Sequence, residues 1–292
     1  MERAVEFVGV SKIFRDFWGR PRVYALREVD LSVPKGSIVA LIGRNGAGKT
    51  TLMHLCLGLL EPSSGRVIVF GKDPRDPWVK ARLGFMPEES TLHSFLTGRE
   101  TLILHAGLCG LPRDQAEARS AYLLERVRLS EAADRRVREY SKGMARRLCL
   151  AQALVGDPEL LVLDEPTSGL DPLGARLVKD LLLELKAMGR TIFLSTHLLG
   201  EIAEVADHIA VLESGRLICS GTKEELLKGQ TWEIISDSLP PHLADRLVSL
   251  LKMGGAKHVE LRRQRQSLEE FFIRTVTSSV GTSFGESEVA GL

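Results

Sequence analysis

The stretch that decides the fold is GRNGAGKTT, residues Gly43–Thr51, which follows the apolar run 37–42. Its first eight residues match G-x-x-x-x-G-K-[S/T], the pattern of a phosphate-binding loop between a strand and a helix. Glycines let consecutive backbone N–H groups turn inward. Together with the N-terminus of the following helix, these groups form a cradle for an anion. The stretch therefore predicts a P-loop nucleoside triphosphatase rather than a plain glycine turn.

The polar side chains of this loop each suit one part of a nucleotide. The Lys49 ammonium would reach the β- and γ-phosphates, the Thr50 hydroxyl would bind Mg²⁺, and Thr51 would contact the α-phosphate. The candidate nucleotide-binding residues of the loop are Gly43, Arg44, Asn45, Gly46, Ala47, Gly48, Lys49, Thr50 and Thr51.

A second chemical signal is the pair of carboxylates that follows the apolar run Leu160–Leu163. A buried strand that ends in Asp164 and Glu165 delivers them to the edge where an open α/β sheet binds ligands. Asp164 would hold Mg²⁺ through water, and Glu165 would accept a proton from the attacking water. A solvated turn before Pro166 is the alternative, and the phosphate loop argues against it.

Composition excludes several classes of protein. A net charge of +1 over 292 residues gives no support to a general nucleic-acid or lipid binder, so we expect no nucleic-acid partner. The four cysteines stand apart, without the spacing of a disulfide framework or a zinc site. No apolar run approaches the ~20 residues that cross a bilayer. We therefore expect a chain that is soluble alone and reaches a membrane only through a partner.

Strands alternate with helices in two parts of the chain, which predicts an α/β fold with a mostly parallel sheet. A helical segment over about 88–157 interrupts the pattern as an inserted subdomain. We expect one domain over 4–228, a small α+β appendage over 229–276 and a disordered tail over 277–292. The expected strands are 5–10, 29–33, 37–42, 66–70, 82–86, 160–163, 191–195, 208–212, 216–220, 231–236 and 257–261, and the main helices 49–59, 174–188, 198–206, 240–253 and 267–276.

Three further stretches complete a set that resembles the ATP-binding cassette (ABC) family. Tyr140–Met144 (YSKGM) resembles the signature loop of that family, Ser168–Asp171 (SGLD) resembles its D-loop, and His197 resembles its switch histidine. With the phosphate loop and the carboxylates, these motifs follow one another in the family's order. The resemblance covers residues 4–228, most of the chain.

The resemblance implies two cassettes that close head to tail around two ATP molecules. Each site would take the phosphate loop from one subunit and the signature loop, here Ser141, Lys142, Gly143 and Met144, from the other. Asp171 would cross the dimer seam, and His197 would hydrogen-bond the γ-phosphate and help position the water at Glu165. One chain that carries both halves favours a homodimer.

The sequence departs from the common family pattern at three positions. Lys142 and Met144 replace a glycine and a glutamine of the signature, and Glu88 stands where the family often carries glutamine. These changes resemble ABC-2-type exporter cassettes, and Glu88 would approach Mg²⁺ or its water. Ser141 alone could also be a simple helix N-cap.

An aromatic ring that stacks on adenine is expected early in the chain. Phe14 fits the spacing of the family after Ser11-Lys12, so we assign the role to it. The nearby rings of Phe17, Trp18 and Tyr24 are rivals, since stacking requires only a flat ring.

The sequence therefore predicts the ATP-hydrolysing subunit of an ABC exporter, with ATP and Mg²⁺ as cofactors. Its partners would be a second cassette and an integral membrane permease that docks on residues 89–111, at the cytoplasmic face of the membrane. A soluble ABC ATPase that acts on ribosomes or DNA, and a nucleotide switch without hydrolysis, are the alternatives.

Overall fold

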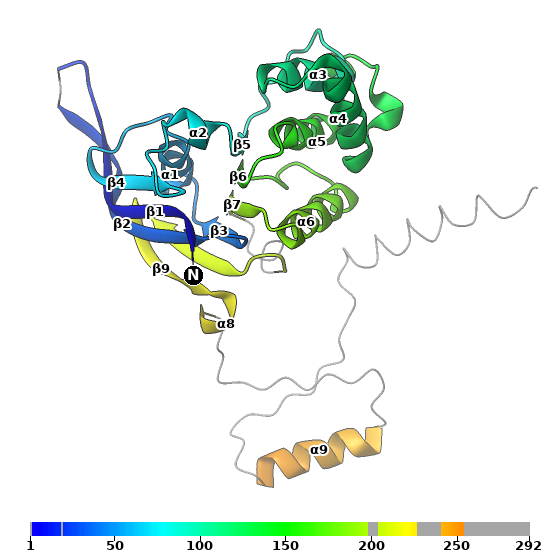
Figure 1. Cartoon of the computed structure of the whole chain (residues 1–292). Coiled ribbons are helices and arrows are strands. Elements are labelled where there is room, and N and C mark those ends of the chain that lie inside the picture. The colour runs from blue at the N-terminus through cyan, green and yellow to red at the C-terminus, as the bar shows by residue number, and fades with distance from the viewer. Residues whose placement is uncertain (1, 19, 198–203, 227–240, 254–292) are drawn as a thin grey trace, which may run out of the picture. The chain divides into compact units, whose positions relative to one another are not determined.

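The computed structural model describes residues 2–18, 20–197, 204–226 and 241–253 (Figure 1). The chain divides into two compact units, Met1–Leu227 and Lys228–Leu292. In the second unit the structure describes one helix, α9 (Pro241–Met253), which confirms the helix expected over 240–253. Across the described residues, no helix combines the length and the apolar content that crossing a bilayer requires. Outside the described residues lie the predicted segments 231–236, 257–261, 267–276 and 277–292, and most of 198–206.

The first unit is built on a six-stranded sheet in the order β5-β6-β7-β3-β8-β9. All neighbouring pairs are parallel except β8 and β9, which form an antiparallel hairpin, so the mostly parallel sheet is confirmed. Its strands are β3 (Ile38–Ile42), β5 (Leu83–Met86), β6 (Leu160–Asp164), β7 (Thr191–Thr196), β8 (His208–Glu213) and β9 (Arg216–Thr222).

A separate three-stranded antiparallel sheet, in the order β2-β1-β4, was not expected from the sequence. Its strands are β1 (Arg3–Arg15), β2 (Pro21–Pro34) and β4 (Ser64–Val69). β1 has 13 residues and β2 has 14, whereas the predicted strands 5–10 and 29–33 have only six and five. They pair through the intervening polar segments as well, where many side chains are exposed.

Successive side chains of the central strands point to opposite faces of the sheet, so the apolar core is divided into two layers. In β3, Val39 and Leu41 pack toward the antiparallel sheet and helix α1 (Lys49–Cys56). Ile38 and Ala40 face the opposite layer, which the helical segment covers. Burial on both faces is what a parallel sheet requires, and it explains why these strands are continuous apolar runs.

The helices bear out the predicted alternation, with shifts at their ends. Helix α1 ends at Cys56 rather than near residue 59, because Gly58 adopts a φ of 60°. The inserted helices are α3 (Gly98–Leu108), α4 (Arg113–Arg126) and α5 (Lys142–Leu154), which cluster together in Figure 1. The other helices are α2 (Pro77–Lys80), α6 (Pro172–Ala187) and α8 (Lys223–Leu226).

Candidate active site

The phosphate loop connects the end of β3 to the start of α1. Gly46 and Gly48 have φ values of 81° and 107°, in the region that favours glycine. A Cβ on Gly48 would lie 2.6 Å from the carbonyl oxygen of Ala25, so a side chain cannot enter without moving backbone. The loop is therefore held against the antiparallel sheet with its N–H groups at the helix N-terminus, as an anion cradle requires.

Lys49 lies at the first turn of α1 and is buried, with 6% of its surface exposed. Its Nζ donates to the carbonyl oxygen of Gly43 at 2.7 Å and lies 3.6 Å from Oε1 of Glu165. The ammonium thus lies between the loop backbone and a carboxylate, where incoming phosphate oxygens would meet it.

Asp164 closes β6 and is almost fully buried. Its Oδ2 accepts a hydrogen bond from the Thr50 hydroxyl at 2.7 Å, and its Oδ1 accepts one from the Ser195 hydroxyl. Carboxylate and hydroxyl oxygens are hard ligands of the type that Mg²⁺ takes, alongside water and nucleotide phosphates. The donors present fit that ion. The described residues contain no group of three or more His, Cys, Asp or Glu side chains that could hold a metal ion without water or nucleotide ligands.

Glu165 is the centre of the site. His197, just beyond β7, places Nδ1 2.9 Å from Glu165 Oε2, while Lys49 approaches the other oxygen. The Glu165 backbone has a φ of 51°, an uncommon conformation for a residue with a side chain, and its N–H donates to Ser195 Oγ at 3.1 Å. The carboxyl ends of neighbouring parallel strands thus bring together three side chains from distant parts of the sequence.

Arg146, in the helix α5, is a residue that sequence reasoning missed. It is 4% exposed. Its Nη1 donates to the carbonyl oxygens of Pro87 and Glu88 at 2.5 and 2.6 Å, and its Nη2 to those of Asp164 and Glu165 at 2.5 and 2.6 Å. Burial lowers the pKa of Arg146, but a guanidinium stays protonated at neutral pH. One guanidinium therefore ties the loop after β5 to the backbone carbonyl groups of Asp164 and Glu165 at the end of β6.

A signal for Arg146 was present in the sequence, in the pattern of its helix. Arg146 shares a face with Leu150 and Leu154, which are both buried. A cation on the buried face of a helix needs compensating acceptors. The sequence did not show which carbonyl groups would supply them.

The signature loop lies at the start of α5, apart from the phosphate loop of its own chain. Ser141 caps the helix, since its Oγ accepts from the N–H of Met144 at 3.2 Å. Ser141 and Lys142 are exposed, and Gly143 and Met144 are half-buried. Among the described residues, no hydrogen bond or ion pair joins these four residues to residues 43–51.

The D-loop neighbours the signature loop. A Cβ on Gly143 would lie 3.6 Å from a methyl carbon of Leu170. Asp171 is the N-cap of α6, and its Oδ1 accepts from the N–H of Gly174 at 2.8 Å. Within its own chain, Asp171 therefore has a structural role, and its role across a dimer seam remains a prediction.

Glu88 contacts the site through its backbone, because its carbonyl oxygen accepts a hydrogen bond from the Arg146 guanidinium. Its side chain is exposed, and among the described residues no hydrogen bond or ion pair links it to Thr50 or Asp164. Its role toward Mg²⁺ remains a prediction.

The four candidate aromatic rings for adenine lie on or near β1 and β2. Phe14 is 39% exposed, with Lys12 Nζ 5.4 Å from its ring centroid. Tyr24 lies on β2 beneath Arg27. Phe17 and Trp18 lie beyond the end of β1, in the turn of the hairpin. The choice of Phe14 remains a prediction.

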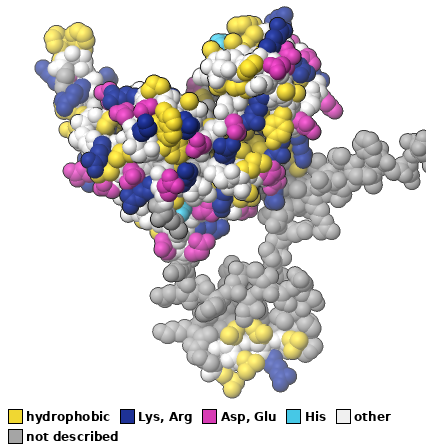
Figure 2. Space-filling model, in the orientation of Figure 1, with side chains coloured by type: hydrophobic (Ala, Val, Ile, Leu, Met, Phe, Trp, Pro, Cys, Tyr) yellow, Lys and Arg dark blue, Asp and Glu magenta, His cyan; other side chains and the backbone are white. Residues whose placement is uncertain are grey.

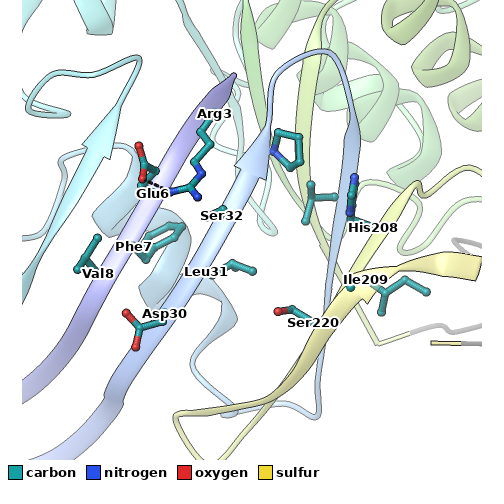
Figure 3. Close-up of a pocket in the computed structure, with 13 residues that line it drawn as sticks. Arg3, Glu6, Phe7, Val8, Asp30, Leu31, Ser32, His208, Ile209 and Ser220 are labelled. Atoms are coloured by element: carbon teal, nitrogen blue, oxygen red, sulfur yellow. Dashed lines mark hydrogen bonds and ion pairs between the residues drawn. The ribbon is translucent and has the colours of Figure 1, made fainter. Parts of the chain in front are cut away.

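A cavity of about 440 Å³ lies elsewhere, between the antiparallel sheet and the β8–β9 hairpin. Figure 3 shows its polar lining, which includes Arg3, Glu6, Asp30 and His208. None of the predicted site residues lines it. The ligand site that the sequence predicts is therefore separate from this cavity.

Known proteins resemble this chain over most of its length. Residues 26–168 match the family model described as ABC transporter. An ABC transporter ATP-binding protein of Nostoc sp. is 40% identical, with 91% of this chain and 88% of that protein covered. A Nod factor export ATP-binding protein of Cupriavidus metallidurans is 38% identical, with 80% and 77% covered. A methionine import ATP-binding protein of Bradyrhizobium diazoefficiens is 36% identical, with 86% and 77% covered.

Solved structures share the fold. The structure of an ATP-binding subunit of an ABC transporter aligns with a TM-score of 0.68 and 28% identity, over 94% of this chain and 99% of that chain. A dimeric ATP-binding cassette, in a post-hydrolysis state bound to ADP and Pi, aligns with a TM-score of 0.68 and 24% identity, over 75% and 98%.

Proposed function

Because this chain belongs to the ABC transporter family and is an ATP-hydrolysing, ATP-binding subunit, we propose that it powers export through a separate membrane permease. It would work as a homodimer on the cytoplasmic face of the membrane. The observation that carries the proposal is the group formed by Lys49, Glu165 and His197, beside the Thr50–Asp164 contact.

These contacts suit phosphoryl transfer to water, which depends on positioning and on neutralising charge. The Lys49 ammonium and the loop N–H groups would stabilise the phosphate oxygens. Glu165, oriented by His197, would accept the proton of the attacking water. Thr50 and Asp164 would hold Mg²⁺, which supplies positive charge at the β- and γ-phosphates when it is bound.

Hydrolysis at this group is tested by Glu165→Gln. The amide keeps the size of the side chain but cannot accept the proton, so kcat should fall by about 10²–10⁴-fold while ATP still binds. Phosphate release and equilibrium binding of a fluorescent ATP analogue measure the two properties separately. An unchanged kcat would remove Glu165 from the proposed role.

The exposure of Ser141 and Lys142 supports a site that is shared between two subunits. Complementation tests this. In a homodimer, Lys49→Ala inactivates the phosphate-loop half of both sites. Ser141→Arg inactivates the signature-loop half of both sites. An equal mixture should recover up to about a quarter of native activity, since half of the dimers are mixed and each carries one intact site. Two inactive variants that stay inactive when mixed, despite subunit exchange, would contradict the shared site.

Export is favoured over import by the SKGM signature and by Glu88, which resemble exporter cassettes, and by the likeness to a Nod factor export protein. Because a methionine import protein is also similar to this chain, the direction of transport has to be measured. Transport into inverted membrane vesicles, driven by ATP outside them, would indicate export. Retention of substrate outside, with uptake only by right-side-out cells, would indicate import.

The permease would dock on residues 89–111, where Phe95, Leu104 and Leu108 are 64%, 43% and 75% exposed. Capture of the tagged chain from detergent-solubilised membranes should yield a multi-span membrane protein in stoichiometric amount. Phe95→Ser should weaken that capture, whereas Met188→Ser, at an equally exposed position beyond α6, should not. Ribosomal or DNA-repair proteins in place of a permease would contradict the proposal.

The comparisons do not support either alternative function, a soluble ATPase that acts on ribosomes or DNA or a nucleotide switch without hydrolysis. None of the relatives reported above carries a name that points to ribosomes or DNA. A switch without hydrolysis conflicts with the family to which the chain belongs.

A further inference from the structure

The hairpin that joins β1 to β2 ends in two aromatic side chains that face solvent. Phe17 is 95% exposed and Trp18 is 79% exposed, and their rings meet edge to face with centroids 5.6 Å apart. Figure 1 shows this hairpin projecting from the first unit, and Figure 2 shows an apolar tip at its end. Two adjacent large rings this exposed are unusual on a surface that stays in water.

The turn that presents these rings is ordered by its own hydrogen bonds. The Asp16 carboxylate accepts from the N–H of Trp18 at 3.0 Å and from the N–H of Arg20 at 2.8 Å. The N–H of Asp16 in turn donates to the carbonyl oxygen of Arg20 at 3.0 Å. The rings are therefore held outward by a closed turn, at little further entropic cost on binding.

Basic side chains surround the base of this tip. Arg15, Arg20 and Arg22 lie within four positions of Trp18, and Asp16 is the only acidic residue from Phe14 to Tyr24. That carboxylate already accepts bonds inside the turn. In the part of the chain that the structure describes, no ion pair joins Arg20 or Arg22 to an acidic side chain.

We propose that this hairpin tip, Phe17 and Trp18 with Arg15, Arg20 and Arg22, inserts into the headgroup layer of an anionic membrane beside the permease. Aromatic rings favour the membrane interface, and arginine is attracted to anionic lipid headgroups. The inference rests on the proposed function, which brings the chain to a membrane. In Figure 1 the hairpin and α3, which lies in the segment proposed to dock the permease, both reach the upper edge of the first unit, at its left and its right.

A tip of this size binds lipid weakly by itself, because stable anchoring takes more than one signal. The permease would hold the chain at the membrane, and the hairpin would set its orientation against the lipid surface. The charge pattern favours lipid over an apolar groove of a protein, since lipid phosphates can pair with the exposed Arg20 and Arg22.

The test measures binding of the full chain to vesicles of phosphatidylcholine with about 30% phosphatidylglycerol, which gives the vesicles a negative surface potential. Co-sedimentation should be weakened about tenfold or more by Phe17→Ser with Trp18→Ser, and by Arg20→Gln with Arg22→Gln. Raising salt to 0.5 M should also weaken it. Matched controls are Leu250→Ser with Leu251→Ser, which removes exposed apolar side chains from α9, and Arg113→Gln with Arg216→Gln.

A spectroscopic measurement locates the contact. The sequence has three tryptophans, so Trp78→Phe with Trp232→Phe leaves Trp18 as the only one. Its emission should shift to the blue when anionic vesicles are added. Unchanged Trp18 emission, or binding lost only in the α9 variant, would overturn the proposal.

The partner could instead be the permease, and one outcome identifies that case. If the Phe17–Trp18 variant loses co-purification with the permease while the native chain never binds vesicles, the tip contacts protein and the lipid proposal fails. ATP hydrolysis by the native chain without vesicles is assayed separately. A failure of the proposed enzymatic role is therefore seen independently of lipid binding.

Discussion

Replacing Arg146 with Met perturbs the site without substituting any of the proposed catalytic residues. Methionine occupies similar volume but donates no hydrogen bond, so the carbonyl groups of residues 87, 88, 164 and 165 lose their donor. They form two pairs, each bonded to one guanidinium nitrogen. At about 1.5–3 kcal/mol for a hydrogen bond to a charged group, two such pairs predict a loss of about 3–6 kcal/mol in the free energy of unfolding.

The effect on catalysis follows from the backbone of Glu165. Its left-handed conformation costs roughly 1–2 kcal/mol and persists because Arg146 holds its carbonyl group and Ser195 its N–H. Without Arg146 the carboxylate would shift. A displacement of about 1 Å is enough to lower kcat by about 100-fold. The Kd for ATP should change by less than about threefold, since the phosphate loop keeps its contacts.

Arg147→Met is the matched control. Arg147 is the next residue on α5, and its Nη1 also donates to two carbonyl oxygens, those of Val127 and Arg128 at 2.7 and 3.0 Å. Neither Val127 nor Arg128 belongs to the group formed by Lys49, Glu165 and His197, so this variant should lose stability without losing kcat. Arg146→Lys should fall between the native chain and Arg146→Met, because one ammonium can satisfy only part of the acceptor set.

Thermal unfolding, phosphate release and ATP binding measured on the same preparations separate the two effects. The reasoning is refuted if Arg146→Met and Arg147→Met have equal kcat values per folded molecule. In that case Arg146 would be a structural cation only. If Arg146→Met does not fold, the comparison of Arg146→Lys with Arg147→Met carries the same test.

Three further predictions concern single residues. Asp164→Asn removes a ligand charge at the Thr50 contact, so the Mg²⁺ concentration for half-maximal ATPase activity should rise at least about tenfold, and an unchanged magnesium requirement would count against the assignment. Gly48→Ala forces a Cβ to within 2.6 Å of the Ala25 carbonyl oxygen at a φ of 107°, and should cost about 1–3 kcal/mol of stability and most ATP binding in calorimetry. Burial raises the pKa of Cys56 to about 12, so its thiol stays protonated at pH 8 and should resist alkylation that modifies the exposed Cys219, as peptide mass spectrometry would show. Equal labelling of both thiols in the folded chain would contradict this burial.

Local patterns predicted the elements that carry their own signal. Gly43–Thr51 identified the loop between strand and helix because glycine spacing, Lys49 and Thr50 are all contiguous in the sequence. The buried strands β3, β6 and β7 were predicted as apolar runs because both of their faces are covered. The limits of β1 and β2 were missed, since pairing between strands extends them through residues that have no apolar pattern.

The contacts of the candidate site were predicted in part. Proximity of Asp164 and Glu165 to the phosphate loop followed from the rule that parallel strands deliver side chains to one edge of the sheet. The 2.9 Å contact of His197 with Glu165 required the order of the strands, in which β7 lies directly beside β6. The signature residues Ser141–Met144 could be named, but their role toward a second subunit remains a prediction.

The sequence by itself therefore determined which backbone could cradle a phosphate and which side chains could neutralise and activate it. That information is local, and a glycine spacing or a terminal carboxylate keeps its meaning in any context. Only the tertiary structure decided how Arg146 acts, because its four acceptors are backbone carbonyl groups from residues 18 to 59 positions away. Every residue carries a carbonyl group, so no sequence pattern marks the few that a buried guanidinium will find. The packing of α5 against the ends of β5 and β6 selects them.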